Sequence, residues 1–218
     1  MSVSSGQRAV VFVSAGAARS GASDSTASAD SRYAWLRLFA ALLVMTIGGV
    51  GIYAPSVVLP AIQQDFGVVR ADASLPYTAL MIGFGIGGIL MGRLADRFGV
   101  MLPLLIGACS LGLGFIASGL STGITGFALA QGLFIGLLGS SASFAPLVAD
   151  TSLWFVKRRG IAVAVCASGN YVAGTIWPPV VQHAVASFGW RPTCIALGVF
   201  SFVVMGSLAL FMRPRPPA

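Results

Sequence analysis

Residues 75–120 read LPYTALMIGFGIGGILMGRLADRFGVMLPLLIGACSLGLGFIASGL. Two apolar runs, Leu75–Leu94 and Met101–Leu120, stand on either side of a short charged segment. Each run has about the 20 apolar residues that an α-helix needs to cross a bilayer. This stretch therefore predicts two membrane-spanning helices joined by a tight charged loop.

The same pattern continues over most of the chain. Hydrophobic residues make up 56% of the 218 residues and charged residues only 9%, whereas a soluble domain carries about 25% charged residues. The mean hydropathy is +0.90. The apolar segments lack the polar-apolar alternation of barrel strands. The predicted fold is an all-α membrane bundle of six transmembrane helices, at residues 36–59, 75–94, 101–120, 124–148, 161–185 and 194–212.

Lysine and arginine are distributed unevenly between the two ends of this predicted bundle. One side has Arg70 and Arg191, while the other side has Arg32, Arg37, Arg93, Arg97, Lys157, Arg158, Arg159, Arg213 and Arg215. Loops rich in these residues stay in the cytoplasm. We therefore expect a multi-pass protein of the cell membrane with both termini cytoplasmic. Tryptophans near span ends are typical of the membrane interface: Trp35, Trp154 and Trp190.

Three regions follow from these observations. Residues 1–32 are rich in Ser, Ala and Gly and are expected to be a flexible cytoplasmic tail. Residues 33–212 are the transmembrane domain, and residues 213–218 are the start of a cytoplasmic linker. The three cysteines are isolated in apolar segments, so no metal site or disulfide framework is expected. No GxxxxGK loop occurs, so neither ATP coupling nor a cofactor is expected.

Glycines are concentrated inside the predicted spans. Residues 83–88, GFGIGG, formally match the dinucleotide fingerprint, but they lie within an apolar helix rather than at a strand-to-helix turn. Small residues four apart let membrane helices approach closely, which predicts close contacts at Gly88 with Gly92 and at Gly132 with Gly136. Gly48, Gly49 and Gly51 before Pro55 predict a bend in the first span, and Pro178-Pro179 predicts an interruption in the fifth.

The segment Gly92-Arg93-Leu94-Ala95-Asp96-Arg97-Phe98-Gly99 resembles the signature loop of the major facilitator superfamily, whose pattern is G-x-L-A-D-R-x-G. Gly92, Leu94, Asp96, Arg97 and Gly99 match it, together with Ala95, while Met101 replaces the basic residue usual two positions later. The resemblance implies one six-helix half of that fold. It also implies that this loop, with the carboxylate of Asp150 at the inner end of the fourth span, controls the cytoplasmic gate.

A second stretch narrows the resemblance. The segment 154–162, WFVKRRGIA, looks like the start of helix five in monocarboxylate-transporter-like members, with Lys157, Arg158 and Arg159 as its basic residues. These members bind anions with intramembrane cations, but the first span here has no cation after Arg37. The resemblance covers residues 33–212 and accounts for the N-terminal half of a twelve-helix carrier.

Polar residues deep in the spans are candidates for a substrate cavity. Asn170 and Tyr171 lie about ten residues, or about 15 Å, into the fifth span, where an amide needs a partner. Tyr53, Gln131 and Trp177 also lie inside spans that line the cavity of the resembled fold. For each of these five residues, a role in helix packing competes evenly with substrate contact.

The predicted function is secondary active transport of a small organic anion such as a monocarboxylate, by proton coupling or exchange, in a form truncated to its N-terminal half. The alternative is a non-transporting remnant, or a half that needs a partner half or a second copy. Ser141 and His183 resemble a rhomboid protease only superficially, because Ala142 follows the serine and the histidine lies at the other end of the next span. The expected partners are lipid and a small molecule, without nucleic acid.

Overall fold

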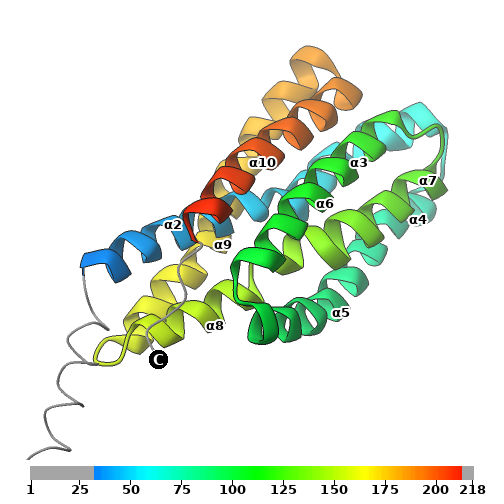
Figure 1. Ribbon diagram of the computed structural model, residues 1–218. Coiled ribbons are helices and arrows are strands. Elements are labelled where there is room, and N and C mark those ends of the chain that lie inside the picture. Colours follow the sequence, from blue (N-terminus) through cyan, green and yellow to red (C-terminus); the bar gives the residue numbers. More distant parts are fainter. Residues whose placement is uncertain (1–31, 213–218) are drawn as a thin grey trace, which may run out of the picture.

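A computed structural model describes residues 32–212, and all regular structure in that range is helical (Figure 1). The helices are α2 (Arg32–Gly48), α3 (Val50–Phe66), α4 (Arg70–Ala73), α5 (Leu75–Phe98), α6 (Met101–Leu120), α7 (Ile124–Leu129), the π-helix η1 (Ala130–Ser140), α8 (Ala145–Trp154), α9 (Arg159–Phe188) and α10 (Trp190–Phe211). The expected linker and tail, apart from Arg32, lie outside the described residues.

The described chain contains six stretches that are long and apolar enough to cross a membrane, which confirms the predicted number. They are Tyr33–Phe66, Ala71–Phe98, Met101–Leu120, Ile124–Trp154, Arg159–Phe188 and Trp190–Phe211. Most are longer than predicted, because helix continues past the apolar run into polar residues such as Gln63 and Asp65. Figure 1 shows the long helices side by side along one axis.

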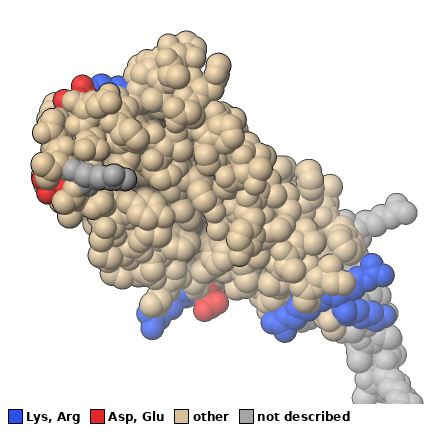
Figure 2. All heavy atoms as spheres, turned by 180° about the vertical axis from the view of Figure 1, so that it is seen from behind, with Lys and Arg blue, Asp and Glu red and all other residues tan. Residues whose placement is uncertain are grey.

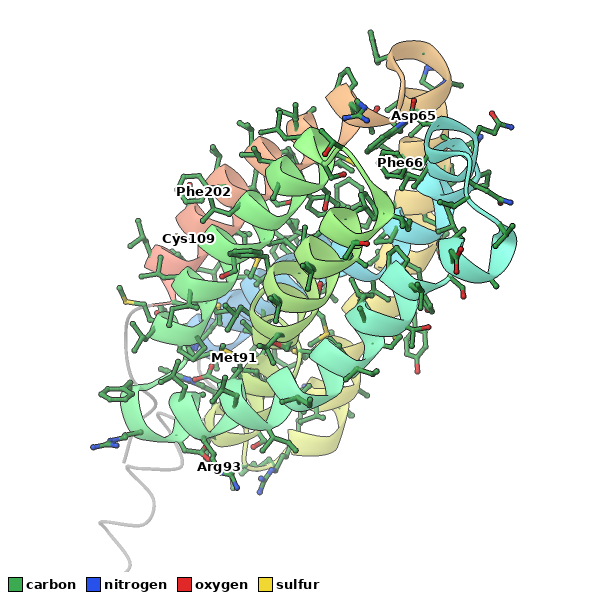
Figure 3. All side chains as sticks on the ribbon, turned by 90° about the vertical axis from the view of Figure 1, so that its right-hand side faces the viewer. Asp65, Phe66, Met91, Arg93, Cys109 and Phe202 are labelled. Atoms are coloured by element: carbon green, nitrogen blue, oxygen red, sulfur yellow. The ribbon has the colours of Figure 1, made fainter. Side chains whose placement is uncertain are left out.

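Charge marks the two ends of this bundle. Figure 2 shows two patches of Lys and Arg atoms along the lower edge of the molecule, with an acidic patch between them, and a mixed cluster at the upper left. The surface between the two edges is almost uncharged. Figure 3 places Arg93 near one end and Asp65 with Phe66 near the other. We call the end that carries Arg37, Arg93 and residues 157–159 the basic end, and the end with Asp65 the opposite end.

Packing between helices follows a simple scheme. α6 lies between α10 and η1, α5 lies against η1, and α9 packs on both α2 and α3. The closest approaches use glycine: a Cβ at Gly136 would overlap the Leu80 carbonyl group, and one at Gly112 would lie 3.1 Å from the Gly198 carbonyl oxygen. Such contacts replace the hydrophobic driving force that is absent in lipid.

Of three local expectations, the close contact at Gly132 with Gly136 is confirmed and the other two are wrong. Gly132 faces α5, where an added Cβ would lie 3.1 Å from the Ala79 side chain. Gly88 and Gly92 instead face open space, and the close contacts of α5 come from Gly83 and Gly87. The predicted spacing of four residues is correct, but α5 has two glycine pairs with that spacing, and the other pair faces the neighbouring helix. The fifth span is also uninterrupted, because α9 continues through Pro178 and Pro179.

The signature loop is mostly helix rather than loop. α5 extends to Phe98, so Asp96 and Arg97 occupy its last turn, where a cation is favoured by the helix dipole. Gly99 has φ +86°, a conformation that L side chains rarely adopt, and it ends the helix. α6 begins at Met101, so the two spans are separated only by Gly99 and Val100.

Candidate functional site at the basic end

A buried ion pair joins the first and fourth spans at the basic end. Arg37 Nε lies 2.9 Å from Asp150 Oδ2, and Arg37 Nη2 lies 3.0 Å from Asp150 Oδ1. The side chains are only 3% and 7% exposed. A buried charge requires a partner with good geometry, and the two parallel bonds of this pair supply it.

Two further contacts fix the Arg37 guanidinium group. Its Nη1 donates to the Met212 carbonyl oxygen at 3.1 Å, and its Cζ lies 4.8 Å from the centre of the Trp154 ring. Met212 follows the last residue of α10, so the cation also satisfies the negative end of that helix. Arg37 therefore connects the first, fourth and sixth spans.

Sequence reasoning missed this role of Arg37 and treated it only as an orienting charge. An Arg between Leu36 and Leu38 in an apolar helix is itself a signal, because an intramembrane cation needs a partner. The signal does not identify Asp150 as that partner. Trp154 ends α8 and Trp190 begins α10, so both lie at span ends as expected, and there they are buried and pack on arginines.

A cleft of about 320 Å³ lies beside the ion pair. It brings together the end of α5 and one face of α8, and its lining is Ala95, Asp96, Arg97, Gly99, Val100, Pro146, Ala149, Asp150 and Leu153. Asp96 and Arg97 are exposed, and the Arg97 guanidinium lies 5.4 Å from the centre of the Phe98 ring. Three predicted gating residues, Asp96, Arg97 and Gly99, thus line the same cleft as Asp150.

The other two predicted gating residues of the signature, Gly92 and Leu94, do not line that cleft. Gly92 has no heavy atom within 4 Å of an added Cβ, apart from its own helix neighbours, and Leu94 is half-buried. The basic residues Lys157, Arg158 and Arg159 are exposed at the turn between α8 and α9. Arg159 Nη2 donates to Ser152 Oγ at 3.1 Å and so ties the start of α9 to α8.

Three of the five candidate cavity residues meet where α9 packs on the first span. The Tyr53 ring covers Gly174, with its Cζ 2.9 Å from the position of an added Cβ. Asn170 Oδ1 lies 3.4 Å from an added Cβ on Gly49. Trp177 Nε1 donates to the Thr46 carbonyl oxygen at 2.7 Å. The Trp177 contact is a hydrogen bond and the other two are close packing contacts, and all three lie near the middle of both spans.

The remaining two cavity candidates lie apart from that group. Tyr171 is on α9 and is 75% exposed. Gln131 is 1% exposed, its Nε2 donates to Ser118 Oγ of α6 at 3.2 Å, and its Oε1 has no hydrogen-bond partner among the described residues. Its assignment to a cavity stays a prediction.

At the opposite end, Arg191 makes a similar set of contacts. Arg191 Nη2 lies 3.0 Å from Asp65 Oδ2, and its Nη1 donates to the Ser121 carbonyl oxygen at 2.8 Å. Its guanidinium lies 4.5 Å from the centre of the Trp190 ring. Each end of the bundle thus has one arginine that joins an aspartate, carbonyl groups at a helix end and an indole ring.

Ser141 and His183, the pair compared with a serine protease, are not brought together by the structure. Ser141 Oγ donates to the Leu137 carbonyl oxygen of its own helix at 2.6 Å, while His183 is exposed near the opposite end. Within residues 32–212, no group of three or more His, Cys, Asp or Glu side chains could hold a metal ion.

Comparison with known proteins adds to this geometry. A sequence model of the Major Facilitator Superfamily matches residues 39–218. Monocarboxylate transporter 6 of Mus musculus is 28% identical over 175 residues, which cover 78% of this chain and 36% of the relative. The probable sulfoacetate transporter SauU of Cupriavidus necator is 29% identical over 167 residues, which cover 74% of this chain and 37% of the relative. The chain thus spans about a third of the length of these curated relatives.

Proposed function

The chain belongs to the major facilitator superfamily, and on this premise we propose that it is a six-helix half of a secondary active transporter for small organic anions. Family membership over most of the chain, together with its six spans, is the observation that carries the transport function. In this family fold, substrate binds near the midplane between two halves that rock against each other. The chain acts as a carrier and not as an enzyme.

The substrate class rests on the similar proteins. One is named for monocarboxylates and another for sulfoacetate, and both names denote small organic acids that are anions near neutral pH. We propose that Tyr53, Asn170, Tyr171 and Trp177, with Gln131 as a further candidate, line this half of the cavity. Tyr53, Asn170 and Trp177 lie together at mid-span, where α9 packs on the first span, and this position supports these three assignments.

The basic end is proposed to face the cytoplasm, in line with the positive-inside rule. There, Asp96 and Arg97 with Gly92, Leu94, Gly99 and Asp150 form the gate, and residues 157–159 anchor the start of α9. The shared cleft of Asp96, Arg97 and Asp150 supports this assignment. Opening and closing of that cleft changes which side of the membrane reaches the cavity.

Transport further requires a second six-helix unit, on the same polypeptide or from another copy. The exposed apolar side chains of α5 and α9 support this proposal, since these two spans bury the smallest share of their residues. Sizing of the purified protein in nanodiscs by native mass spectrometry tests it. A chain that transports as a single six-helix monomer would contradict the need for a second unit.

Uptake into proteoliposomes tests the function. Vesicles containing the protein are given labelled lactate or sulfoacetate, with and without an inward proton gradient and with and without unlabelled anion inside. We expect saturable uptake above that of protein-free vesicles, accelerated by the gradient if protons are coupled or by internal anion if exchange operates. Loss of the gradient effect on adding a protonophore distinguishes the two modes. No uptake of either anion by folded protein containing both six-helix units would refute the proposed substrate class.

A further inference from the structure

The first span is broken near its middle. α2 ends at Gly48 and α3 begins at Val50. Backbone bonds at the junction run from Gly49 N to the Met45 carbonyl oxygen, at 3.0 Å, and from Ile52 N and Tyr53 N to the Gly49 carbonyl oxygen. The carbonyl groups of Thr46 and Gly48 receive none of these junction bonds. In lipid such groups must find other partners.

Side chains from two other spans bind the released carbonyl groups. Trp177 Nε1 of α9 donates to the Thr46 oxygen at 2.7 Å, and Ser140 Oγ at the end of η1 donates to the Gly48 oxygen at 3.1 Å. An unpaired carbonyl in this apolar interior would cost several kcal/mol. The two side chains therefore allow the break to exist without exposing backbone to lipid.

The fourth span is broken at the same place. η1 ends at Ser140 and α8 begins at Ala145, with short-range bonds from Ser143 N to the Ser140 oxygen and from Phe144 N to the Ser141 oxygen between them. The two breaks are in contact, because a Cβ added to Gly48 would overlap the side chain of Ser143. π-helical segments inside membrane or soluble α-helices are rare and occur frequently at functional sites.

The two segments on the basic side of the breaks are linked a second time. α2 and α8 share the Arg37–Asp150 pair. Aromatic contacts add to this link: the Tyr33 and Trp154 ring centres are 5.4 Å apart. α2 and α8 are thus joined near the basic end by an ion pair and at mid-span by the touching breaks.

We propose that α2 and α8 turn together as one gating unit about the paired breaks at Gly48–Gly49 and Ser143–Phe144. This inference rests on the proposed transport function, because the turning would open and close the basic-end side of the cavity. Trp177 and Ser140 are positioning residues of this hinge. They hold the released carbonyl groups while the basic-side halves of the two spans turn relative to α5.

Distances between spin labels in nanodiscs test the gating unit without any substrate. Labels are attached to cysteines at exposed positions of a background in which Cys109, Cys166 and Cys194 are replaced. The pair Leu36→Cys with Leu153→Cys lies within the unit, on α2 and α8, and the pair Leu36→Cys with Phe98→Cys joins the unit to α5. Pulsed electron paramagnetic resonance then gives the distance distribution of each pair.

We expect a narrow distribution within the unit and a broader one between the unit and α5. Trp177→Phe keeps the ring that packs on Phe200 but removes the donor, and Ser140→Ala removes the other donor. Each variant should roughly double the width of the Leu36/Phe98 distribution and leave Leu36/Leu153 unchanged. Ser207→Ala, whose hydroxyl bonds its own helix at an exposed site, is the control and should change neither.

Two results would overturn the proposal. Equal broadening of both pairs would mean that α2 and α8 move separately, and unchanged distributions in both variants would mean that the two donors do not hold a hinge. The distances do not depend on uptake. Absent uptake with the expected distances would therefore refute only the transport function, and normal uptake with either contrary result would refute only the hinge.

Discussion

Arg37 and Asp150 are 113 residues apart in the sequence, yet their side chains form a buried two-bond ion pair at the basic end of the bundle. The pair at the opposite end, Arg191 with Asp65, has similar chemistry but side chains that are 39% and 44% exposed. Burial decides how much stability is lost when one partner of a pair is removed. Solvent screens the charges of an exposed pair, whereas a buried charge that loses its partner remains uncompensated.

Asp150→Asn should therefore lower the free energy of unfolding by about 3–5 kcal/mol, since it leaves the Arg37 charge buried without its carboxylate. The matched change Asp65→Asn should cost about 1 kcal/mol or less, because that pair is exposed. Denaturant titration in detergent micelles, followed by tryptophan fluorescence, compares the two. The double variant Arg37→Met/Asp150→Leu should recover much of the loss, and equal costs for Asp150→Asn and Asp65→Asn would contradict this account.

The glycines of α5 offer a second test within one helix. Gly87→Ala places a methyl group against the Leu137 carbonyl oxygen and Ser141, so it should destabilise the protein by about 1–3 kcal/mol. Gly88→Ala, one residue away, meets open space and should be neutral or stabilising by up to about 1 kcal/mol through helix propensity. Thermal unfolding in nanodiscs measures both, and a reversed order would show that α5 is rotated from the position described.

Asp96→Asn should slow exchange between the two transport states, because it removes the exposed carboxylate of the gate while changing no described hydrogen bond. An effect on uptake of about five-fold or more is expected, the size typical of coupling between conformational states. Asp72→Asn, an exposed aspartate in the first turn of α4 near the opposite end, is the control. Accessibility is measured as the reaction of a water-soluble thiol reagent with Ala149→Cys, a probe introduced into the lining of the cleft. Unchanged uptake and unchanged reactivity of that probe in Asp96→Asn would remove Asp96 from the gate.

Gln131 carries a buried amide oxygen without a partner among the described residues. Gln131→Met replaces the amide by an apolar chain of similar length, and Ser118 keeps its bond to the Gly114 carbonyl oxygen. We expect unchanged stability or a gain of about 1–2 kcal/mol, because the desolvation cost of the orphan oxygen disappears. A loss of stability on thermal unfolding would show instead that a water molecule or a cavity ligand satisfies that oxygen.

Local sequence was a good guide to the spans and a poor guide to their contacts. All six spans were predicted, and the Gly48–Gly49 break was expected from three glycines before Pro55. Pro178 and Pro179 gave the wrong expectation, because neighbouring groups in a membrane bundle can satisfy the backbone groups that proline frees. The signature segment was identified, but its helical extent depended on where Gly99 ends α5.

In the candidate site, too, the sequence predicted positions of residues along the spans but not their bonding partners. Asp150 was expected beside the signature residues, and it does share their cleft. Its bond to Arg37 could not be predicted, because Met101 stands where the resembled family usually has a basic residue and several other arginines remained as partners. Likewise, Trp177 was chosen for its depth in the span, while its bond to the Thr46 carbonyl oxygen required knowledge of the helix contacts.

Sequence alone determined that this protein has six membrane helices, with its positive charge gathered at one end, because lipid selects for the length and hydrophobicity of each segment independently. Only the tertiary structure decided which glycines of α5 meet η1, which arginine neutralises Asp150, and that the breaks of the first and fourth spans touch. Those outcomes depend on the rotation of each helix about its axis, and the simultaneous packing of all six helices sets that rotation.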